Sequence, residues 1–269
     1  MLVEPGALDR DVPSQVDFAL ATLDDLIGLL GWRAAADDLN AVVRAALPAT
    51  ANDARLLRGG LGLGVAADPD LELRVYLDLR AGVPAARWQR LADTLSLFGD
   101  AETEATLRGI LRRGAPVAVP VALAAVLADG ALRGLRLYLG VEYAGYAQLA
   151  ALTALPAETI ARFCERLGPF GPQRVTAAFD FALEDRSLRG ILARTKLDAC
   201  RLGIPPREVR AELEALADVC RLERAPLHAF LDDLRDAFDG STIQYVGVGH
   251  RGDETEVTVY AQPAGLARR

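Results

Sequence analysis

The sequence predicts an α+β fold, a closed antiparallel β-barrel surrounded by helices and built from tandem ααββ repeats. Three observations lead to this prediction. The 269-residue chain passes four times through the same order of two helical patterns and two strand patterns. The second strand of each unit alternates polar and apolar residues, with the polar ones at even positions. Each unit ends in a hairpin, so consecutive hairpins can pair until no sheet edge is left unpaired.

The first unit shows this order clearly. Residues 16–31 and 32–47 keep apolar residues at helical spacing, and Pro48 closes the second helix. The period then changes to two, and Asp68-Pro69-Asp70 is a turn signal between two alternating runs. The unit therefore ends in a β-hairpin.

The other three units repeat the pattern. Their strand pairs are predicted at residues 117–127 and 135–143, 174–183 and 188–199, and 242–250 and 254–262. The long helical stretch before the third pair is expected to break before Pro156. No linker rich in Pro, Gly or Ser separates the units, so we expect a single domain over residues 1–269, with residues 1–13 as a flexible tail.

The two faces of the predicted strands differ in kind. Eight amphipathic helices need an apolar surface to cover, and the leucine and valine face of the sheet supplies it. In an open sheet the polar face would meet water, whereas in a closed sheet it would line a lumen. Glycine and alanine at alternate positions of the first strands would leave space there for a ligand. We expect closure.

Such a lumen would collect cationic and aromatic side chains. They are Arg74, Arg136, Arg194 and Lys196, together with Tyr76, Tyr138 and Tyr260. Several cations in one enclosure repel one another and are costly to desolvate, so they need anions. Internal carboxylates on the same strand faces could supply them as ion pairs. These are Glu72, Asp78, Glu142, Asp198, Glu254 and Glu256. The alternative is a bound diphosphate, held by guanidinium groups and covered by tyrosine rings.

Composition excludes several other classes. The formal charge of −7 argues against a nucleic-acid surface. The three cysteines and two histidines have no metal-ligand spacing, and they are read as reduced thiols and ordinary polar residues. The Asp232-Asp233-x-x-Asp236 pattern resembles a magnesium motif of all-helical isoprenoid enzymes, but no partner motif exists, so a solvated helix face is expected. No signal peptide or long apolar run is present, so we expect a soluble, cytoplasmic protein without a membrane partner.

In its repeat order and its strand signatures, the sequence resembles the aromatic prenyltransferases of the ABBA, or PT-barrel, type. The repeat order is similar over nearly the whole chain. In the dimethylallyltryptophan synthase branch a basic residue stands two before a tyrosine on successive strands, and Arg74-Val75-Tyr76 and Arg136-Leu137-Tyr138 look like that pattern. Arg194-Thr195-Lys196 and Thr258-Val259-Tyr260 look like two further strands of the branch. The compact size looks more like the bacterial small-molecule and cyanobactin-peptide branches.

The resemblance implies transfer of a dimethylallyl or geranyl group from its diphosphate to an indole, a phenol or an aromatic side chain of a peptide. It implies that the four cationic residues bind diphosphate and that the three tyrosines shield the allyl cation. Glu142 and Asp180 are the candidate proton acceptors. No cofactor is required by the family at large, although Asp78 and Asp198 could hold Mg²⁺, on which part of the family depends.

The chain also departs from this family. Asp198 stands where the family has tyrosine, Thr258 stands where a basic or amide residue is common, and the first strand lacks the usual acid. We count four units, whereas the family usually has five. These departures favour the alternative function, a barrel that binds small molecules or has lost catalysis and has filled its lumen with ion pairs.

Overall fold

The computed structural model describes most of the chain. The described residues are 2–3, 21, 23–47, 61–67, 71–99, 105, 109, 112, 118–141, 145–170, 174–184, 187–237, 240–251 and 254–262. By its internal contacts the chain divides into two compact units. Unit 1 comprises Met1–Leu139 and Phe179–Ala193, and unit 2 comprises Gly140–Ala178 and Arg194–Arg269. Each unit is described by itself.

The fold is α+β, and its strands are ordered in the sheet as they are in the chain. The strands are β1 (Leu2–Val3), β2 (Leu61–Ala67), β3 (Leu71–Asp78), β4 (Ala118–Ala128), β5 (Ala131–Val141), β6 (Arg174–Glu184), β7 (Ser187–Ile204), β8 (Thr242–Arg251) and β9 (Glu254–Gln262). The pairings β1–β2, β2–β3, β3–β4, β7–β8 and β8–β9 are antiparallel. The predicted hairpins β2–β3 and β8–β9 are therefore confirmed as antiparallel pairs, and β4 and β5, like β6 and β7, are neighbours in the sheet. Closure into a barrel stays a prediction.

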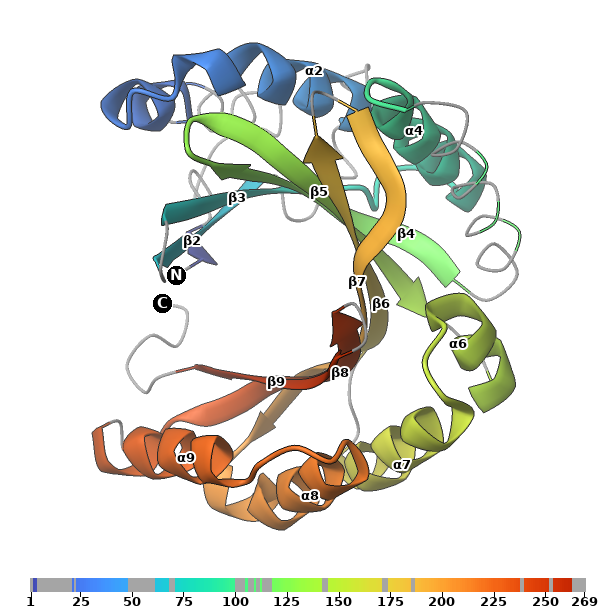
Figure 1. The fold of residues 1–269 in the computed structure, drawn as a ribbon, viewed down its shortest axis with the longest axis vertical. Coiled ribbons are helices and arrows are strands. Elements are labelled where there is room, and N and C mark those ends of the chain that lie inside the picture. The colour runs from blue at the N-terminus through green and yellow to red at the C-terminus, as the bar shows by residue number, and fades with distance from the viewer. Residues whose placement is uncertain are drawn as a thin grey trace. The chain divides into compact units, whose positions relative to one another are not determined.

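Unit 1 packs helices on one face of its strands. The helices α2 (Ala36–Ala46), which follows the short 3₁₀ helix η1 (Arg33–Ala35), and α4 (Pro84–Ser96) contact each other and β4 (Figure 1). Proline at the first position suits the start of α4, since its missing N–H has no partner there. Leu73, Val75 and Leu77 of β3 are almost completely buried, so the apolar odd face is the core face, as predicted.

The β4–β5 hairpin turns through Asp129 and Gly130. Both have positive φ, 50° and 73°, which is what a two-residue turn between antiparallel strands requires. An added Cβ at Gly130 would meet Trp32 Cδ1 at 3.4 Å, an ordinary contact. Glycine therefore suits this position by its conformation.

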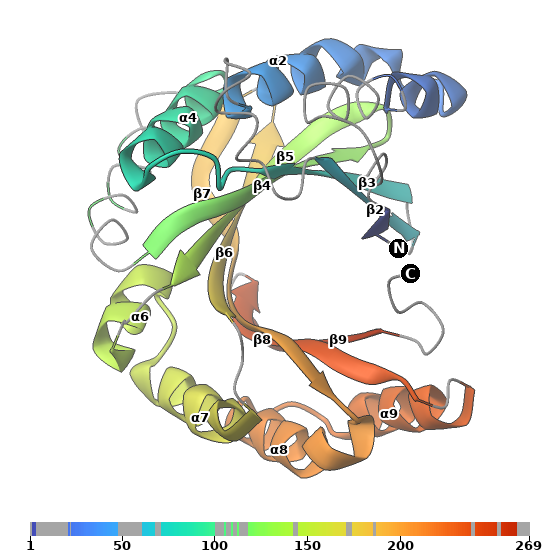
Figure 2. The same ribbon diagram turned by 180° about the vertical axis from the view of Figure 1, so that it is seen from behind.

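The described part of unit 2 contains four α-helices, two between β5 and β6 and two between β7 and β8. They are α6 (Tyr146–Thr153), α7 (Ala157–Leu167), α8 (Pro206–Val219) and α9 (Ala225–Ala237), with the 3₁₀ helix η2 (Gly168–Phe170) after α7. The predicted break before Pro156 is confirmed, because α6 ends at Thr153 and Pro156 is the N-cap of α7. Figure 2 shows α8 and α9 lying along β8 and β9. The apolar face of α8 is buried, and it includes Val209, Leu213 and Leu216.

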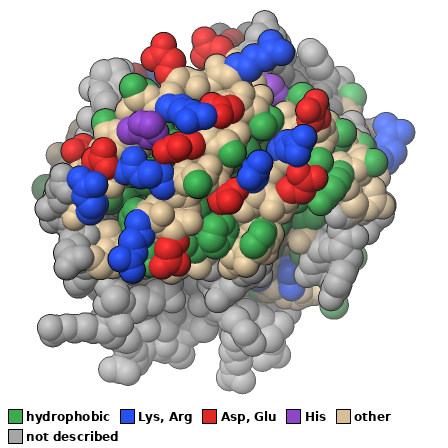
Figure 3. All heavy atoms as spheres, turned by 90° about the horizontal axis from the view of Figure 1, so that it is seen from below, with side chains coloured by type: hydrophobic (Ala, Val, Ile, Leu, Met, Phe, Trp, Pro, Cys, Tyr) green, Lys and Arg blue, Asp and Glu red, His purple; other side chains and the backbone are tan. Residues whose placement is uncertain are grey.

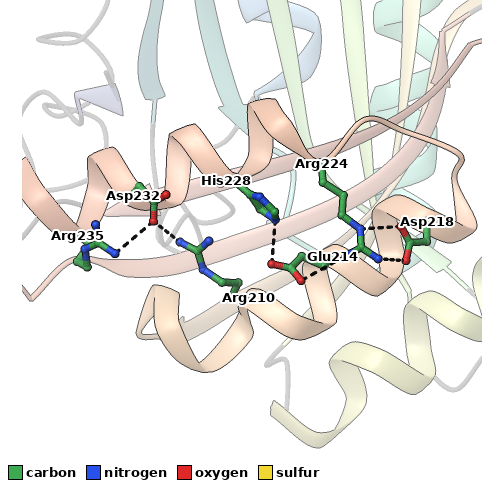
Figure 4. Close-up of polar contacts among 7 residues, drawn as sticks. All are labelled: Arg210, Glu214, Asp218, Arg224, His228, Asp232 and Arg235. Carbon is green, nitrogen blue, oxygen red and sulfur yellow. Dashed lines mark hydrogen bonds and ion pairs between the residues drawn. The ribbon is translucent and has the colours of Figure 1, made fainter.

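Charged side chains of both signs are interspersed on the outer face of unit 2 (Figure 3). Several of them join α8 to α9 (Figure 4). His228 Nε2 lies 2.9 Å from Glu214 Oε1, and Arg224 contacts both Glu214 and Asp218. Each of these half-exposed pairs adds little to stability, because water screens their charges.

A second group of contacts on the same two helices involves Asp232, the first residue of the acidic motif Asp232-Asp233-x-x-Asp236. Asp232 accepts hydrogen bonds from Arg210 and Arg235, so this acid serves ion pairs on a solvated helix face, as expected (Figure 4).

Two expectations concern residues that the structure covers only in part. Leu2 and Val3 form β1, paired with Gly64 and Leu63 of β2, but residues 4–13 lie outside the described residues, so the tail stays a prediction. None of the helices that the structure describes has the length and apolar character of a membrane span.

Candidate active site

The even positions of β3 form a polar row bordered by small residues. Arg74 stands opposite Gly64 of β2, and Tyr76 stands between Gly62 of β2 and Ala124 of β4. Glu72, Arg74 and Tyr76 are all half-buried, whereas their odd neighbours are buried. Because neighbouring strands lie about 4.8 Å apart, the missing side chains leave room beside the long polar ones. This bears out the small-or-polar character predicted for the even face.

Among the described side chains of this face, Arg136 of β5 is more enclosed than Arg74. Its Nε and Nη2 donate to the two carboxylate oxygens of Asp180 on β6. The side chain of Arg136 is 9% exposed and that of Asp180 is 19% exposed. A two-pronged pair of this kind is among the strongest polar contacts in proteins, and it is oriented as well as strong.

The β5–β6 spacing at this pair depends on Gly134. A Cβ added to Gly134 would lie 2.6 Å from the carbonyl oxygen of Phe181, which follows Asp180 in β6. Only glycine allows so close an approach. Gly134 therefore belongs to the construction of the site, although it carries no chemistry.

Arg74 is held by a carboxylate as well. Its Nε donates to Oε1 of Glu72, two residues earlier on β3, and the two side chains are 24% and 30% exposed. The charge of Arg136 acts on Arg74, which places the two guanidinium groups in one electrostatic neighbourhood.

The two tyrosines predicted for this face lie together. The rings of Tyr76 and Tyr138 have centroids 6.1 Å apart and an interplanar angle of 39°. Hydrogen bonding couples the Tyr138 hydroxyl to both Arg136 and Tyr76. The aromatic pair therefore stands directly beside the guanidinium group of Arg136.

The protonation states of this cluster are set by burial and by the paired charges. Burial and the charge of Arg136 lower the pKa of Arg74, whereas Glu72 and Tyr76 raise it. The raising effects are larger together, so the net pKa of Arg74 is raised. Burial also lowers the pKa of Arg136, but the hydrogen bonds and charges of Asp180 and Tyr138 together outweigh burial, so the net pKa of Arg136 is raised. Burial raises the pKa of Tyr138 well above 10.0, so the phenol is neutral at pH 7.

We call these six residues the β3–β5–β6 cluster: Glu72, Arg74, Tyr76, Arg136, Tyr138 and Asp180. Five of the residues predicted for the site come together here, all in unit 1. The cluster pairs two arginines with two acidic residues, so its formal charges balance.

The contacts of Asp78 do not suit a metal ligand, because its carboxylate is engaged by Arg80. Arg80 donates from Nε and Nη2 to the two oxygens of Asp78, with distances of 3.0 and 2.6 Å, and its backbone N–H donates to Oδ1 at 2.8 Å. A carboxylate engaged in this way has little capacity left for a cation. Among the residues that the structure describes, no group of three or more His, Cys, Asp or Glu could hold a metal ion.

Unit 2 carries the other predicted residues. Arg194, Lys196 and Asp198 occupy successive even positions of β7, opposite Arg251, Gly249 and Gly247 of β8. The side chains of Arg194 and Lys196 are outside the described part, as is Glu142 altogether, and Asp198 is buried. Glycines border the polar positions here as they do in unit 1.

Tyr260 has an aromatic neighbour that the sequence analysis missed. Tyr245 of β8 is its cross-strand partner, and the two rings meet edge to face with centroids 6.1 Å apart. They are 39% and 41% exposed. The signal was present in the alternation of the eighth strand, which puts Tyr245 on the same face as Gly247 and Gly249.

Comparison with known proteins bears on the fold. No protein-family model matches the sequence, and no curated protein matches it. Among solved structures, 5-dimethylallyltryptophan synthase from Streptomyces coelicolor is similar with a TM-score of 0.71 and 16% identity, over 100% of this chain and 77% of that chain. Prenyltransferase PriB, in a ternary complex with L-tryptophan and dimethylallyl thiolodiphosphate, gives a TM-score of 0.69 and 17% identity, over 97% and 74%.

The chain has the fold of the aromatic prenyltransferases. AnaPT from Neosartorya fischeri is similar too, with a TM-score of 0.61 and 13% identity over 84% of this chain and 64% of that chain. The resemblance drawn from the strand signatures is thus confirmed at the level of the fold. At such identities the likeness concerns the fold alone, and the chemistry of this chain has to be argued from its own residues.

Proposed function

We propose that this protein transfers an isoprenyl group, dimethylallyl or geranyl, from its diphosphate to an aromatic acceptor. The acceptor is an indole, a phenol or an aromatic side chain of a peptide. One observation supports this most: two arginines and two tyrosines gather on one partly open strand face of a prenyltransferase fold. The proposal includes a single domain over residues 1–269, closure of the sheet into a barrel of tandem ααββ units, a cytoplasmic location, and a relationship to the bacterial small-molecule or cyanobactin-peptide branch.

In the proposed reaction the carbon–oxygen bond of the donor breaks, and the electron pair leaves with the diphosphate. Arg74 and Arg136, joined by Arg194 and Lys196 from β7, stabilise the charge that develops on the leaving group. The faces of Tyr76, Tyr138 and Tyr260 shield the allyl cation from water. The aromatic ring then attacks the cation, and Glu142 or Asp180 accepts the ring proton. No step is assigned to a metal ion.

A second function is favoured by a specific observation. Both arginines of the β3–β5–β6 cluster have a carboxylate partner, Glu72 for Arg74 and Asp180 for Arg136. A barrel that binds a neutral small molecule, or none, would need such pairs to stabilise its interior. The departures at Asp198 and in the first strand favour the same alternative.

Diphosphate binding separates the two functions. Titration calorimetry would compare inorganic diphosphate and dimethylallyl diphosphate binding to the wild type, to Arg136→Ala and to the control Arg133→Ala. Arg133 lies on the same strand, but its side chain is 52% exposed and it pairs with Asp129. Loss of charged hydrogen bonds at Arg136 should weaken binding at least about tenfold, whereas the control should bind as the wild type does.

Turnover completes the test. The protein would be incubated with dimethylallyl and geranyl diphosphates, with and without Mg²⁺, and with indoles, phenols and aromatic peptides, followed by mass spectrometry. A product larger than the acceptor by one isoprenyl unit is expected. Neither turnover nor diphosphate binding in the wild type would exclude the transferase and leave the binding barrel.

A further inference from the structure

The β3–β5–β6 cluster poses a problem for diphosphate binding. Its two arginines are paired with Glu72 and Asp180, so these six residues by themselves offer an incoming diphosphate no net positive charge. The two carboxylates would also repel it at short range, because like charges interact strongly where water is partly excluded. An anion can bind the Nε and Nη2 edge of Arg136 only if the carboxylate of Asp180 leaves it.

Asp180 is placed to be exchanged for such an anion. Its two oxygens use the Nε and Nη2 edge of Arg136, and two phosphate oxygens would bind the same edge in the same two-pronged manner. The exchange is therefore one for one: either the carboxylate or the phosphate group holds that edge.

The exposure of the pair fits such an exchange. Asp180 is about twice as exposed as Arg136, at 19% against 9%, so solvent reaches the carboxylate more readily than the guanidinium group. A short side chain on a strand can move to another staggered rotamer without moving the backbone. Arg136 is also held by Tyr138, so the cation stays in place while the carboxylate moves.

From this geometry we propose that diphosphate displaces Asp180 from Arg136, and that the carboxylate so released accepts the proton from the aromatic ring. This inference rests on the proposed transferase function and selects one of its two candidate acids. After displacement Asp180 has lost its cationic partner, which makes it a better proton acceptor. Binding of the isoprenyl diphosphate thereby frees the carboxylate that later takes the proton from the aromatic substrate.

The proton balance of this step is complete. The carbon–hydrogen bond of the alkylated ring breaks, its electron pair restores the aromatic system, and the proton passes to the Asp180 carboxylate. Asp180 becomes a neutral carboxylic acid, and the diphosphate keeps Arg136 charged and paired. Release of diphosphate then returns the proton to water and Asp180 to Arg136.

The decisive experiment uses Asp180→Asn, with Asp93→Asn as control. Asp93 is an exposed acid of α4 whose side chain bonds only to Gln89 among the contacts described. Calorimetry with inorganic diphosphate should show binding about tenfold tighter in Asp180→Asn, because the internal competitor is lost, and unchanged binding in Asp93→Asn. Turnover of Asp180→Asn should fall at least about a hundredfold, the usual contribution of a general base.

Each other outcome counts against the inference. Equal or weaker diphosphate binding by a folded Asp180→Asn variant overturns the displacement, and full turnover overturns the role as base. If the wild type binds no diphosphate at all, the proposed function fails first and this inference with it.

A measurement on the wild type covers the case in which the variant does not fold. Saturating diphosphate should shift one carboxylate band in the infrared difference spectrum, as an aspartate leaves its guanidinium partner. A spectrum without that shift overturns the displacement without any substitution.

Discussion

Replacing Gly134 by alanine tests how closely β5 and β6 must approach for the Arg136–Asp180 pair to form. The added Cβ would lie 2.6 Å from the Phe181 carbonyl oxygen, whereas ordinary contacts begin at 3.4 Å. The obstacle is backbone, so no side chain can turn away to relieve it. The two strands must separate by roughly 0.8 Å, at a point two residues from Arg136 and one residue from Asp180.

The expected cost follows from two opposing effects. Overpacking of this kind costs about 1–3 kcal/mol. Alanine recovers about 0.5–1 kcal/mol, because it loses less backbone entropy than glycine in a strand. The net free energy of unfolding should fall by about 1–2 kcal/mol, which lowers Tm by about 2–8 °C for a chain of this size.

Thermal unfolding followed by circular dichroism measures the effect. Gly28→Ala is the matched control: Gly28 lies in the helical segment 23–29, and an added Cβ there meets no atom within 4 Å. The control should be as stable as the wild type or more stable, because alanine favours a helix. If Gly134→Ala matches the wild type in Tm, the close approach at Phe181 does not govern this part of the sheet.

Two further predictions concern titration. Hydrogen bonds from Arg224 hold the pKa of Asp218 below its ordinary 3.8, so this carboxylate stabilises the fold above that pH and loses its effect as the pH falls through the lowered pKa. Asp218→Asn should therefore be slightly less stable than the wild type at pH 7, and the gap in Tm should close as the pH falls below 3.8 and through the lowered pKa; a constant gap would contradict this. Burial raises the pKa of Cys220 to about 11, so at pH 8 its alkylation by iodoacetamide should be roughly a hundredfold slower than that of a thiol with a pKa of 9.0; mass spectrometry would show a comparable rate if the reasoning fails.

The sequence predicted those features of the fold that depend on local periodicity. Strict alternation in residues 71–80 fixes which side chains share a face, and the burial of Val75 and Leu77 follows from it. Turn residues between the alternating runs predicted where the hairpins lie, and Pro156 predicted the break between α6 and α7.

Features that depend on the register between strands far apart in the chain could not be predicted from local sequence patterns. Arg136 and Asp180 are 44 positions apart, and both were named as candidates, yet nothing local shows that they are partners. The same holds for Tyr245, whose significance comes only from its pairing with Tyr260. Barrel closure is likewise a property of the whole sheet, which no single strand pattern encodes.

The register of β3 against its neighbours restricts how this chain can change in length. Arg74 and Tyr76 stay on the polar face of the sheet only while they remain opposite Gly64 and Gly62. Insertion or deletion of one residue inside the strand would turn every following side chain to the opposite face, which brings leucines to the polar side and charges into the core. Two-residue changes keep the faces intact. Length variation within such strands should therefore occur in pairs of residues, and single-residue changes should be confined to the loops.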